Sequence, residues 1–261
     1  MGFDDGRKTR GLCQAHVKGS ERLSGHIVRV TLAGESLAGL PRRGFDHWFR
    51  LFLPGDGDDG ALELAPDRFT TGTYLKFVAS GGAKRLTVRN YTVRHHRPES
   101  GEVDVDFVVH AGGVAGPWAA AARPGARVAL LDQGRGFDLL PDSDFFLLAG
   151  DESAQPAIMG ILRDLPGDAR GLAVIEVAEP ADADEGPAPS GVEVRRLFRD
   201  AGDSAGALAL AEVRAFQPAR PETLSAYIAG EHTLAQEGRR HLVASAVPKQ
   251  RVVFMGYWRA A

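Results

Sequence analysis

The chain changes character near Pro141. Before that residue, short runs typical of β-strands are separated by Gly, Pro and Asp, whereas after it strand-like runs alternate with helical segments. The spacing of the early runs predicts an antiparallel β-barrel. The predicted strands are Gly25–Thr31, His47–Leu53, Leu86–Arg94, Val103–His110 and Arg127–Leu131, with one short helix over Trp118–Ala122.

The second half has the pattern of an α/β domain with a parallel sheet. Phe145–Ala149 is a continuous apolar run, which indicates a strand buried on both faces. Ser153 is placed to cap a helix over Gln155–Leu165. Further elements are expected at Ala173–Val177, Leu208–Phe216, Ser225–Ala229, Glu231–Leu242 and Val252–Tyr257, with a solvated loop over Glu179–Ser190 that includes Asp182. We therefore expect a barrel domain at 1–142 and an α/β domain at 143–261.

Composition excludes several classes of function. The net charge of -3 argues against a general nucleic-acid binder. The single cysteine, Cys13, cannot form an internal disulfide, a thiolate iron–sulfur site or a Cys-rich zinc site. Redox chemistry would therefore require an organic cofactor. Cys13 itself is interpreted as a bystander in a flexible leader.

The sequence also predicts where the protein works. No apolar stretch is long enough to span a membrane, so no membrane partner is expected. The first residues lack the basic and apolar regions of a signal peptide. We expect a cytoplasmic protein, with a monomer as the default state.

The hexapeptide Arg89–Arg94 combines a flat aromatic ring, a small hydroxyl group and fixed cations. On a strand, Arg89 and Tyr91 face one side and Thr92 faces the other. Tyr91 can cover one face of a flavin ring, Thr92 can donate a hydrogen bond near N5, and Arg89 can bind the pyrophosphate. A half-buried strand with solvated arginines explains the same residues equally well.

A Gly-rich turn follows the predicted strand that ends at His110, and the turn opens a helix. Such a turn points backbone N–H groups at an anion, and the helix dipole adds positive potential. The turn is interpreted as a pyrophosphate site, with His110 contacting the flavin ribose or ring. A plain β–α turn with a structural histidine is the alternative. The glycines of the turn are Gly112, Gly113 and Gly116.

The segment Leu147–Ile158 contains the first strand–helix turn of the α/β half, where open α/β sheets bind ligands. Asp151 and Glu152 replace the glycines that a G-x-G-x-x-G loop would have. Two carboxylates repel a pyrophosphate but can receive a ribose or adenine. The sequence therefore leaves the nicotinamide phosphate site undefined.

These clusters occur in the order and spacing of the siderophore-interacting protein family, which the chain resembles from about Gly25 to Arg259. The barrel followed by an α/β domain is likewise similar to ferredoxin-reductase-like flavoproteins. Each motif alone is modest, whereas five in order are specific. The shared segments are Arg89–Arg94, Asp106–His110 with its Gly-rich turn and Trp118, Ala149–Ile158, Ala229–Glu231 and Gly256–Arg259.

The resemblance implies an FAD-binding β-barrel, an NAD(P)H-binding α/β domain and the reduction of ferric siderophores. Electrons would pass from NADPH or NADH to FAD and then singly to Fe(III) in its chelate, with no catalytic side chain beyond the flavin. Ser153 stands where the family commonly has Thr, which keeps a hydroxyl group. The matching cofactor-binding residues are Arg89, Tyr91, Thr92, Asp106, His110, Ala115, Gly116, Trp118, Asp151 and Ser153. Gly112 of the Gly-rich turn is a further expected cofactor-binding residue.

The tail from Gly238 to Ala261 contains no acidic residue. A local cationic patch suits the anionic ferric complex of a siderophore. Lys249 and Arg251 precede the last predicted strand, whereas Trp258 and Arg259 follow it. These four residues are expected to bind the ferric siderophore, with a purely structural role as the alternative.

Several alternatives stay open. A reduced ferredoxin could replace NADPH or NADH as electron donor, because no 2′-phosphate site can be read. Another flavin or quinone reductase of the same architecture, or a non-catalytic flavin- or siderophore-binding module, would show similar motifs. Neighbouring strand residues point to opposite faces, so His95 and His96 are interpreted as loop or surface residues and no metal site is predicted. The unspecific candidates for a 2′-phosphate are Arg195, Arg196 and Arg199.

Overall fold

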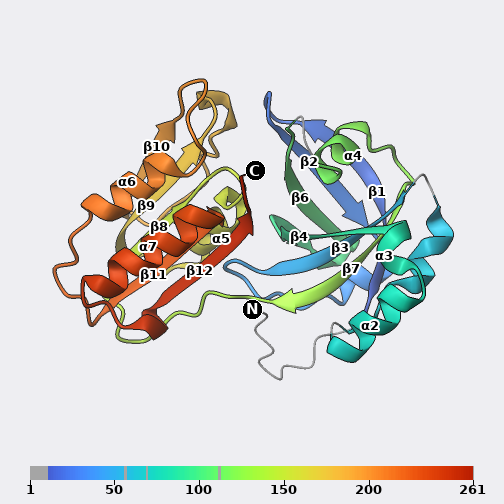
Figure 1. Ribbon diagram of the computed structural model, residues 1–261, viewed down its shortest axis with the longest axis horizontal. Coiled ribbons are helices and arrows are strands. Elements are labelled where there is room, and N and C mark those ends of the chain that lie inside the picture. The colour runs from blue at the N-terminus through green and yellow to red at the C-terminus, as the bar shows by residue number, and fades with distance from the viewer. Residues whose placement is uncertain (1–10, 56–57, 69, 111–112, 261) are drawn as a thin grey trace. The chain divides into compact units, whose positions relative to one another are not determined.

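The computed structural model describes residues 11–55, 58–68, 70–110 and 113–260. The chain divides into two compact units, which are described separately (Figure 1). The first unit comprises the residues up to Arg22, Val28–Arg43 and His47–Gly134. The second comprises Leu23–Ile27, Gly44–Asp46 and Arg135–Ala261.

The first unit is built on a seven-stranded sheet in the order β4-β3-β7-β1-β2-β6-β5. Strand β1 pairs antiparallel with β2 and β7, and β3 pairs antiparallel with β4 and β7. Strand β4, at one end of the order, also contacts β6, which is next to the other end, so the sheet curls into the predicted barrel (Figure 1). The strands are β1 (Cys13–Arg22), β2 (Ile27–Ala33), β3 (Trp48–Pro54), β4 (Leu86–Thr92), β5 (His95–Arg97), β6 (Glu102–Val108) and β7 (Arg127–Gly134).

Alternating side chains along the strands fill the barrel. In β3, Phe49 and Leu51 belong to the main core, whereas Phe52 belongs to a smaller cluster on the opposite face. Phe77 of α2 covers that smaller cluster. The helices and 3₁₀ turns of this unit are α1 (Glu35–Ala38), η2 (Asp59–Leu64), α2 (Thr71–Ala79), α3 (Gly82–Arg85), η3 (Pro98–Ser100) and α4 (Ala115–Ala121).

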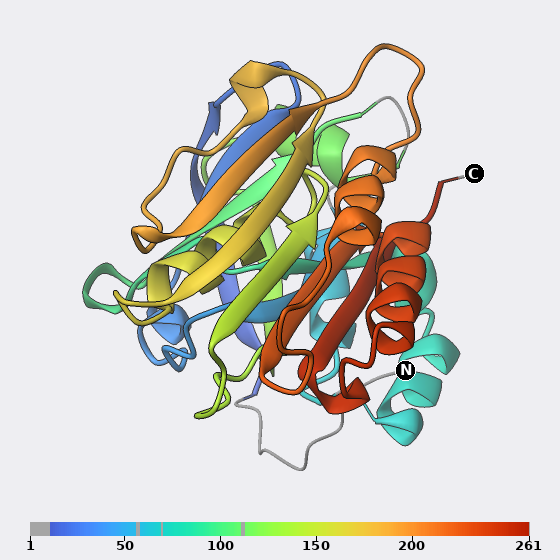
Figure 2. The same cartoon turned by 90° about the vertical axis from the view of Figure 1, so that its left-hand side faces the viewer.

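The second unit is built on a parallel sheet in the order β10-β9-β8-β11-β12, which confirms the predicted α/β fold. Ile158 of α5 packs on one face, and Leu210 of α6 and Leu234 of α7 pack on the other (Figures 1 and 2). The elements are β8 (Phe145–Gly150), α5 (Gln155–Asp164), β9 (Arg170–Val177), η4 (Pro180–Asp182), β10 (Gly191–Phe198), α6 (Ala207–Ala215), β11 (Leu224–Glu231), α7 (His232–Ala244), η5 (Lys249–Arg251) and β12 (Val252–Trp258).

The order of the parallel strands determines where a ligand binds. The first strand in the chain, β8, lies in the middle of the sheet between β9 and β11. Strands β9 and β10 lie on one side of β8, and β11 and β12 lie on the other, so the strand order reverses between β8 and β11. Open α/β sheets bind ligands at this reversal, beyond the carboxyl ends of the strands. In this unit those ends are Gly150 and Glu231.

The interpretation of Cys13 as part of a flexible leader is wrong. Cys13 is the first residue of β1 and is only 4% exposed. The buried face of β1 continues with Ala15 and Val17, and of these only Val17 is a residue that favours strands, which gives a weak strand signal in the sequence.

The expected helix cap is also wrong. Ser153 does not cap α5, because the N-cap is Ala154 and the Ser153 hydroxyl donates to Asp151 instead. His95 and His96 lie in strand β5 rather than in a loop, but both are only half-buried, as surface residues are. Within the part of the chain that the structure describes, none of the helices is both long and apolar enough to cross a membrane.

Candidate functional site

Three aromatic rings lie together in the first unit. Tyr91 on β4 packs against Phe107 on β6 with ring centroids 4.3 Å apart, and Phe107 packs against Trp118 on α4 at 5.7 Å. Phe107 is buried, as is Thr92, whereas Tyr91 and Trp118 are half-buried. Burial raises the pKa of the Tyr91 hydroxyl well above its ordinary range, so this group stays neutral. Tyr91 is therefore a neutral ring supported from behind, with part of its surface accessible.

The charged residues near this ring differ in how they are engaged. Arg89 is exposed, and its guanidinium donates to the backbone oxygen of Val88 at 2.8 Å. Asp106 accepts two hydrogen bonds from Arg29, at 2.6 and 2.8 Å, and lies 3.7 Å from Arg94. The carboxylate predicted to contact the flavin is thus held by Arg29. Sequence reasoning missed Arg29 because it lies on β2, far from the motif along the chain.

The turn between β6 and α4 brings two backbone segments into close contact. A Cβ atom on Gly116 would lie 2.8 Å from the backbone oxygen of Val108, so the fold itself requires glycine here. Gly113 has a φ of +86°, in the left-handed region that favours glycine. Of the other predicted residues, Ala115 is buried, His110 is exposed and Gly112 lies outside the described residues.

Asp151 joins the carboxyl ends of β8 and β11 in the second unit. Its fully buried carboxylate accepts hydrogen bonds from the Ser153 N–H at 2.9 Å and hydroxyl at 2.5 Å. It also accepts from the Glu231 N–H at 2.6 Å and from the Trp258 Nε1–H at 2.9 Å. Asp151 thereby fixes the end of the tail at the position where the strand order reverses.

The buried position of Asp151 predicts a pH-dependent stability. Desolvation raises its pKa from 3.8 to about 6, so between these values the folded protein holds a proton that the unfolded chain releases. Protonation of Asp151 in the folded state therefore adds to the free energy of unfolding. This added stability is fully present below pH 3.8 and is lost as the pH rises through about 6. The expected loss is about 3 kcal/mol, at about 1.4 kcal/mol per pKa unit.

Asp151→Asn removes this titration. The difference in unfolding free energy between wild type and variant, measured by urea titration, should therefore fall by about 3 kcal/mol from about pH 4 to about pH 7. The asparagine also loses acceptors, but that loss adds a constant offset. A difference that does not change with pH would contradict the raised pKa.

The predicted substrate residues lie at opposite ends of β12. Trp258 ends the strand and Arg259 follows it, and both are exposed. Arg251 precedes the strand and is buried, with its guanidinium donating to the Asp142 carboxylate and to two backbone oxygens. The exposed Lys249 lies next to it in η5. The strand separates the two pairs by roughly 20 Å, so the four residues do not form one patch.

Acidic residues also gather at the carboxyl ends of the neighbouring strands. Both carboxylate oxygens of Glu152 accept from the Arg199 guanidinium, at 2.6 and 2.7 Å. The buried Glu176, near the end of β9, accepts from the same guanidinium at 3.1 Å. Glu176 also accepts from the N–H groups of Gly206 and Ala209 at the start of α6. Arg199 is therefore engaged between two carboxylates.

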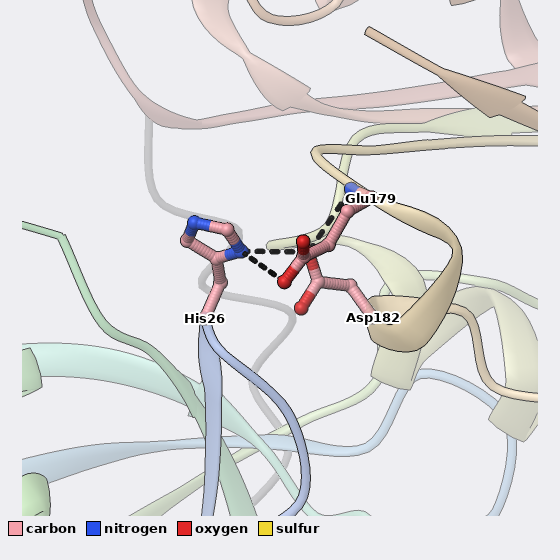
Figure 3. A group of neighbouring side chains, drawn as sticks. All are labelled: His26, Glu179 and Asp182. Atoms are coloured by element: carbon pink, nitrogen blue, oxygen red, sulfur yellow. Dashed lines mark hydrogen bonds and ion pairs between the residues drawn. The ribbon is translucent and has the colours of Figure 1, made fainter.

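His26, Glu179 and Asp182 form a second group in this unit (Figure 3). The His26 Nδ1 atom lies 2.9 Å from Asp182 and 3.4 Å from Glu179. Asp182 is buried, contrary to the solvated loop that the sequence predicts, and it also accepts from the Ser24 hydroxyl at 2.5 Å. The three ligand atoms lie within 4.8 Å of one another, a spacing that could accommodate a shared cation.

Two surface hollows lie at the other edge of this sheet. Their volumes are about 320 and 470 Å³, and both are lined by Phe145, Phe216 and Gln217. Phe145 is the first residue of β8, so the hollows lie at the amino end of this strand. In open α/β sheets, ligands bind instead beyond the carboxyl ends of the strands, at the position where the strand order reverses. These hollows therefore lie away from the edge at which open α/β sheets bind their ligands.

Comparison with known proteins identifies the family. Residues 16–136 match the siderophore-interacting FAD-binding domain, and residues 143–261 match the siderophore-interacting protein domain. The chain is 32% identical to the ferric vibriobactin reductase ViuB of Vibrio cholerae, over 91% of its own length and 85% of that protein's. The chain belongs to the siderophore-interacting protein family.

Two further proteins resemble this chain over nearly its whole length. The NADPH-dependent ferric-chelate reductase of Escherichia coli is 28% identical, with 92% of this chain and 90% of that protein covered. The crystal structure of a siderophore utilization protein from T. fusca matches with a TM-score of 0.80 and 29% identity, covering 97% of this chain and 95% of that one. The fold of the family therefore extends over both units of this member.

In this siderophore-interacting protein, the predicted site residues gather in two groups. Tyr91 and Trp118 share the aromatic cluster of the first unit, whereas Asp151, Ser153 and Trp258 meet in the second. Sequence reasoning assigned no role to Phe107, although it lies inside a quoted motif. An aromatic residue at an inward-facing strand position is the signal that could have found it.

Proposed function

We propose that this protein is a cytosolic, flavin-dependent reductase that transfers electrons from NADH or NADPH through FAD to a ferric siderophore, releasing ferrous iron. The observation that carries the proposal is the accessible Tyr91 ring, supported by Phe107, inside a domain that matches the family's FAD-binding domain. The likeness to a ferric vibriobactin reductase over most of the chain supports a ferric siderophore as the substrate.

The residues of the first unit fit FAD. Tyr91 offers the flat surface that an isoalloxazine ring requires, and the exposed Arg89 offers a cation for the pyrophosphate. Gly116, where even a Cβ atom does not fit, keeps the turn free of side-chain bulk. When bound, FAD would supply a carrier that takes electrons in pairs from a nicotinamide and gives them up singly. The side chains therefore only need to bind and orient.

Trp258 and Arg259 are the residues that we propose to face the siderophore. The Trp258 indole is fixed by its hydrogen bond to Asp151, yet it remains 38% exposed. A fixed aromatic surface beside an exposed guanidinium suits an anionic, aromatic ferric catecholate. Hard oxygen ligands hold ferrous iron less tightly than ferric iron, so reduction favours release. Arg251 is excluded, because its guanidinium is engaged at the other end of β12.

The test is anaerobic turnover by the purified protein, supplied with FAD if it lacks flavin absorbance. A ferrous-specific chelator should develop colour only when NADH or NADPH, FAD and a ferric catecholate are all present. Turnover with a quinone but not with the ferric catecholate would favour another flavin reductase. Bound FAD that neither nucleotide reduces would contradict the proposed donor and favour ferredoxin or a non-catalytic module. Failure to bind FAD would overturn the whole proposal.

A further inference from the structure

The carboxyl edge of the second unit's sheet contains the features that distinguish NADH from NADPH, if the nicotinamide donor of the proposed function is correct. In nucleotide-binding α/β sheets, an acidic residue after the second strand accepts a hydrogen bond from the adenosine ribose 2′-hydroxyl. An arginine nearby instead accommodates the 2′-phosphate of NADPH. The second strand here is β9, which ends at Val177.

Glu179 is the acidic residue in that position. It follows β9 by two residues, and its side chain is 47% exposed. Asp182 lies beside it but is only 1% exposed, and its carboxylate is occupied by His26, Ser24 and the Glu179 N–H (Figure 3). Glu179 lies 3.4 Å from the same His26 nitrogen, but its carboxylate stays accessible, so of these two carboxylates it is the one that can receive a ribose hydroxyl.

The arginines that could hold a 2′-phosphate are already engaged. Arg199 is bound by Glu152 and Glu176, so a phosphate approaching it would meet two carboxylates. Arg195 donates to Glu193 and Glu212, each at 2.7 Å. Arg196 donates to the backbone oxygen of Asp184, at 2.8 and 3.3 Å.

We propose that Glu179 binds the adenosine ribose 2′-hydroxyl and that the surrounding carboxylates exclude a 2′-phosphate, which makes NADH the nucleotide donor. Asp182 adds negative charge beside Glu179, and Glu152 and Glu176 outnumber the one arginine, Arg199, that they share at the same carboxyl edge. A phosphate monoester carries close to two negative charges at neutral pH. This donor differs from that of the NADPH-dependent relative in Escherichia coli.

The experiment compares two nucleotide fragments by isothermal titration calorimetry: ADP-ribose and ADP-ribose carrying a 2′-phosphate. The wild type should bind ADP-ribose at least about tenfold more tightly than the 2′-phosphorylated fragment. A repulsion of about 1.4 kcal/mol between the 2′-phosphate and the carboxylates corresponds to this factor of ten in the dissociation constant. In the Glu179→Gln variant, the ratio of the dissociation constants of the two fragments should be smaller than in the wild type by a factor of about five or more. EDTA must be present, because a divalent cation on His26, Glu179 and Asp182 would neutralise both carboxylates.

Glu222→Gln is the matched control, because Glu222 is an exposed acidic residue that lies two residues before β11, at the amino edge of the same sheet. It should keep the wild-type preference. The proposed selectivity would be overturned if the wild type bound the 2′-phosphorylated fragment more tightly than ADP-ribose. It would also be overturned if both glutamine variants changed the ratio of the dissociation constants equally. Either result would leave the reductase proposal intact. Failure of both fragments to bind would overturn the selectivity together with the nicotinamide donor.

Discussion

Replacing Tyr91 with alanine should weaken FAD binding by roughly 10- to 100-fold. Stacking of a base on an aromatic side chain contributes about 1–3 kcal/mol, and a flavin ring offers a comparable surface. The Tyr91 ring is held at 4.3 Å from Phe107, so it needs little ordering when the cofactor binds. Tyr91→Phe keeps the ring and should bind FAD within about threefold of wild type.

The measurement is a fluorescence titration of FAD into the flavin-free protein. Val88→Ala is the matched control, since Val88 lies on the same strand but packs on the smaller cluster of the opposite face. It should cost stability without weakening FAD binding. If Val88→Ala weakened FAD as much as Tyr91→Ala, the effect would come from damage to β4, and the stacking role of Tyr91 would be wrong.

The largest loss of stability is expected from Gly230→Ala. A Cβ atom at this position would lie 2.6 Å from the carboxyl atoms of Asp151, and the φ of +119° is already unfavourable for any residue with a side chain. The alanine must therefore push the buried carboxylate away from its donors. Backbone strain and unsatisfied hydrogen bonds together should cost about 3–5 kcal/mol.

Gly202→Ala separates these two causes. Gly202 has a φ of +101°, but a Cβ atom there would meet nothing within 4 Å. Only the backbone strain remains, so the expected loss is about 1–2 kcal/mol. Urea unfolding followed by circular dichroism measures both variants. Equal losses for Gly230→Ala and Gly202→Ala would show that contact with Asp151 contributes nothing.

Much of the fold could be predicted from the sequence, because its strands have distinct patterns. The continuous apolar run at Phe145–Ala149 became the central strand β8, as expected for burial on both faces. Strands β1 and β10 escaped prediction for opposite reasons. Among the buried residues of β1 only Val17 favours strands, whereas β10 is an edge strand with one buried residue, Val192, and three charged ones.

The candidate site was less predictable, because its contacts join residues that are distant in the chain. The motif around Asp151 could be recognised, but the hydrogen bond from Trp258 depends on how β8, β11 and β12 align. The charge pattern of the tail placed Arg251 with the substrate residues. A net charge does not reveal which cations are engaged, and the structure pairs Arg251 with Asp142 at the far end of the strand.

In the proposed function, electrons from a nicotinamide reach siderophore-bound iron through FAD held by this chain. The most direct test is anaerobic titration of the FAD-loaded protein with NADH in the presence of a ferric catecholate and a ferrous-specific chelator. About two ferrous ions are expected for each NADH oxidised, because a nicotinamide supplies an electron pair and each iron takes one electron. Oxidation of NADH without the appearance of ferrous iron would contradict this electron path.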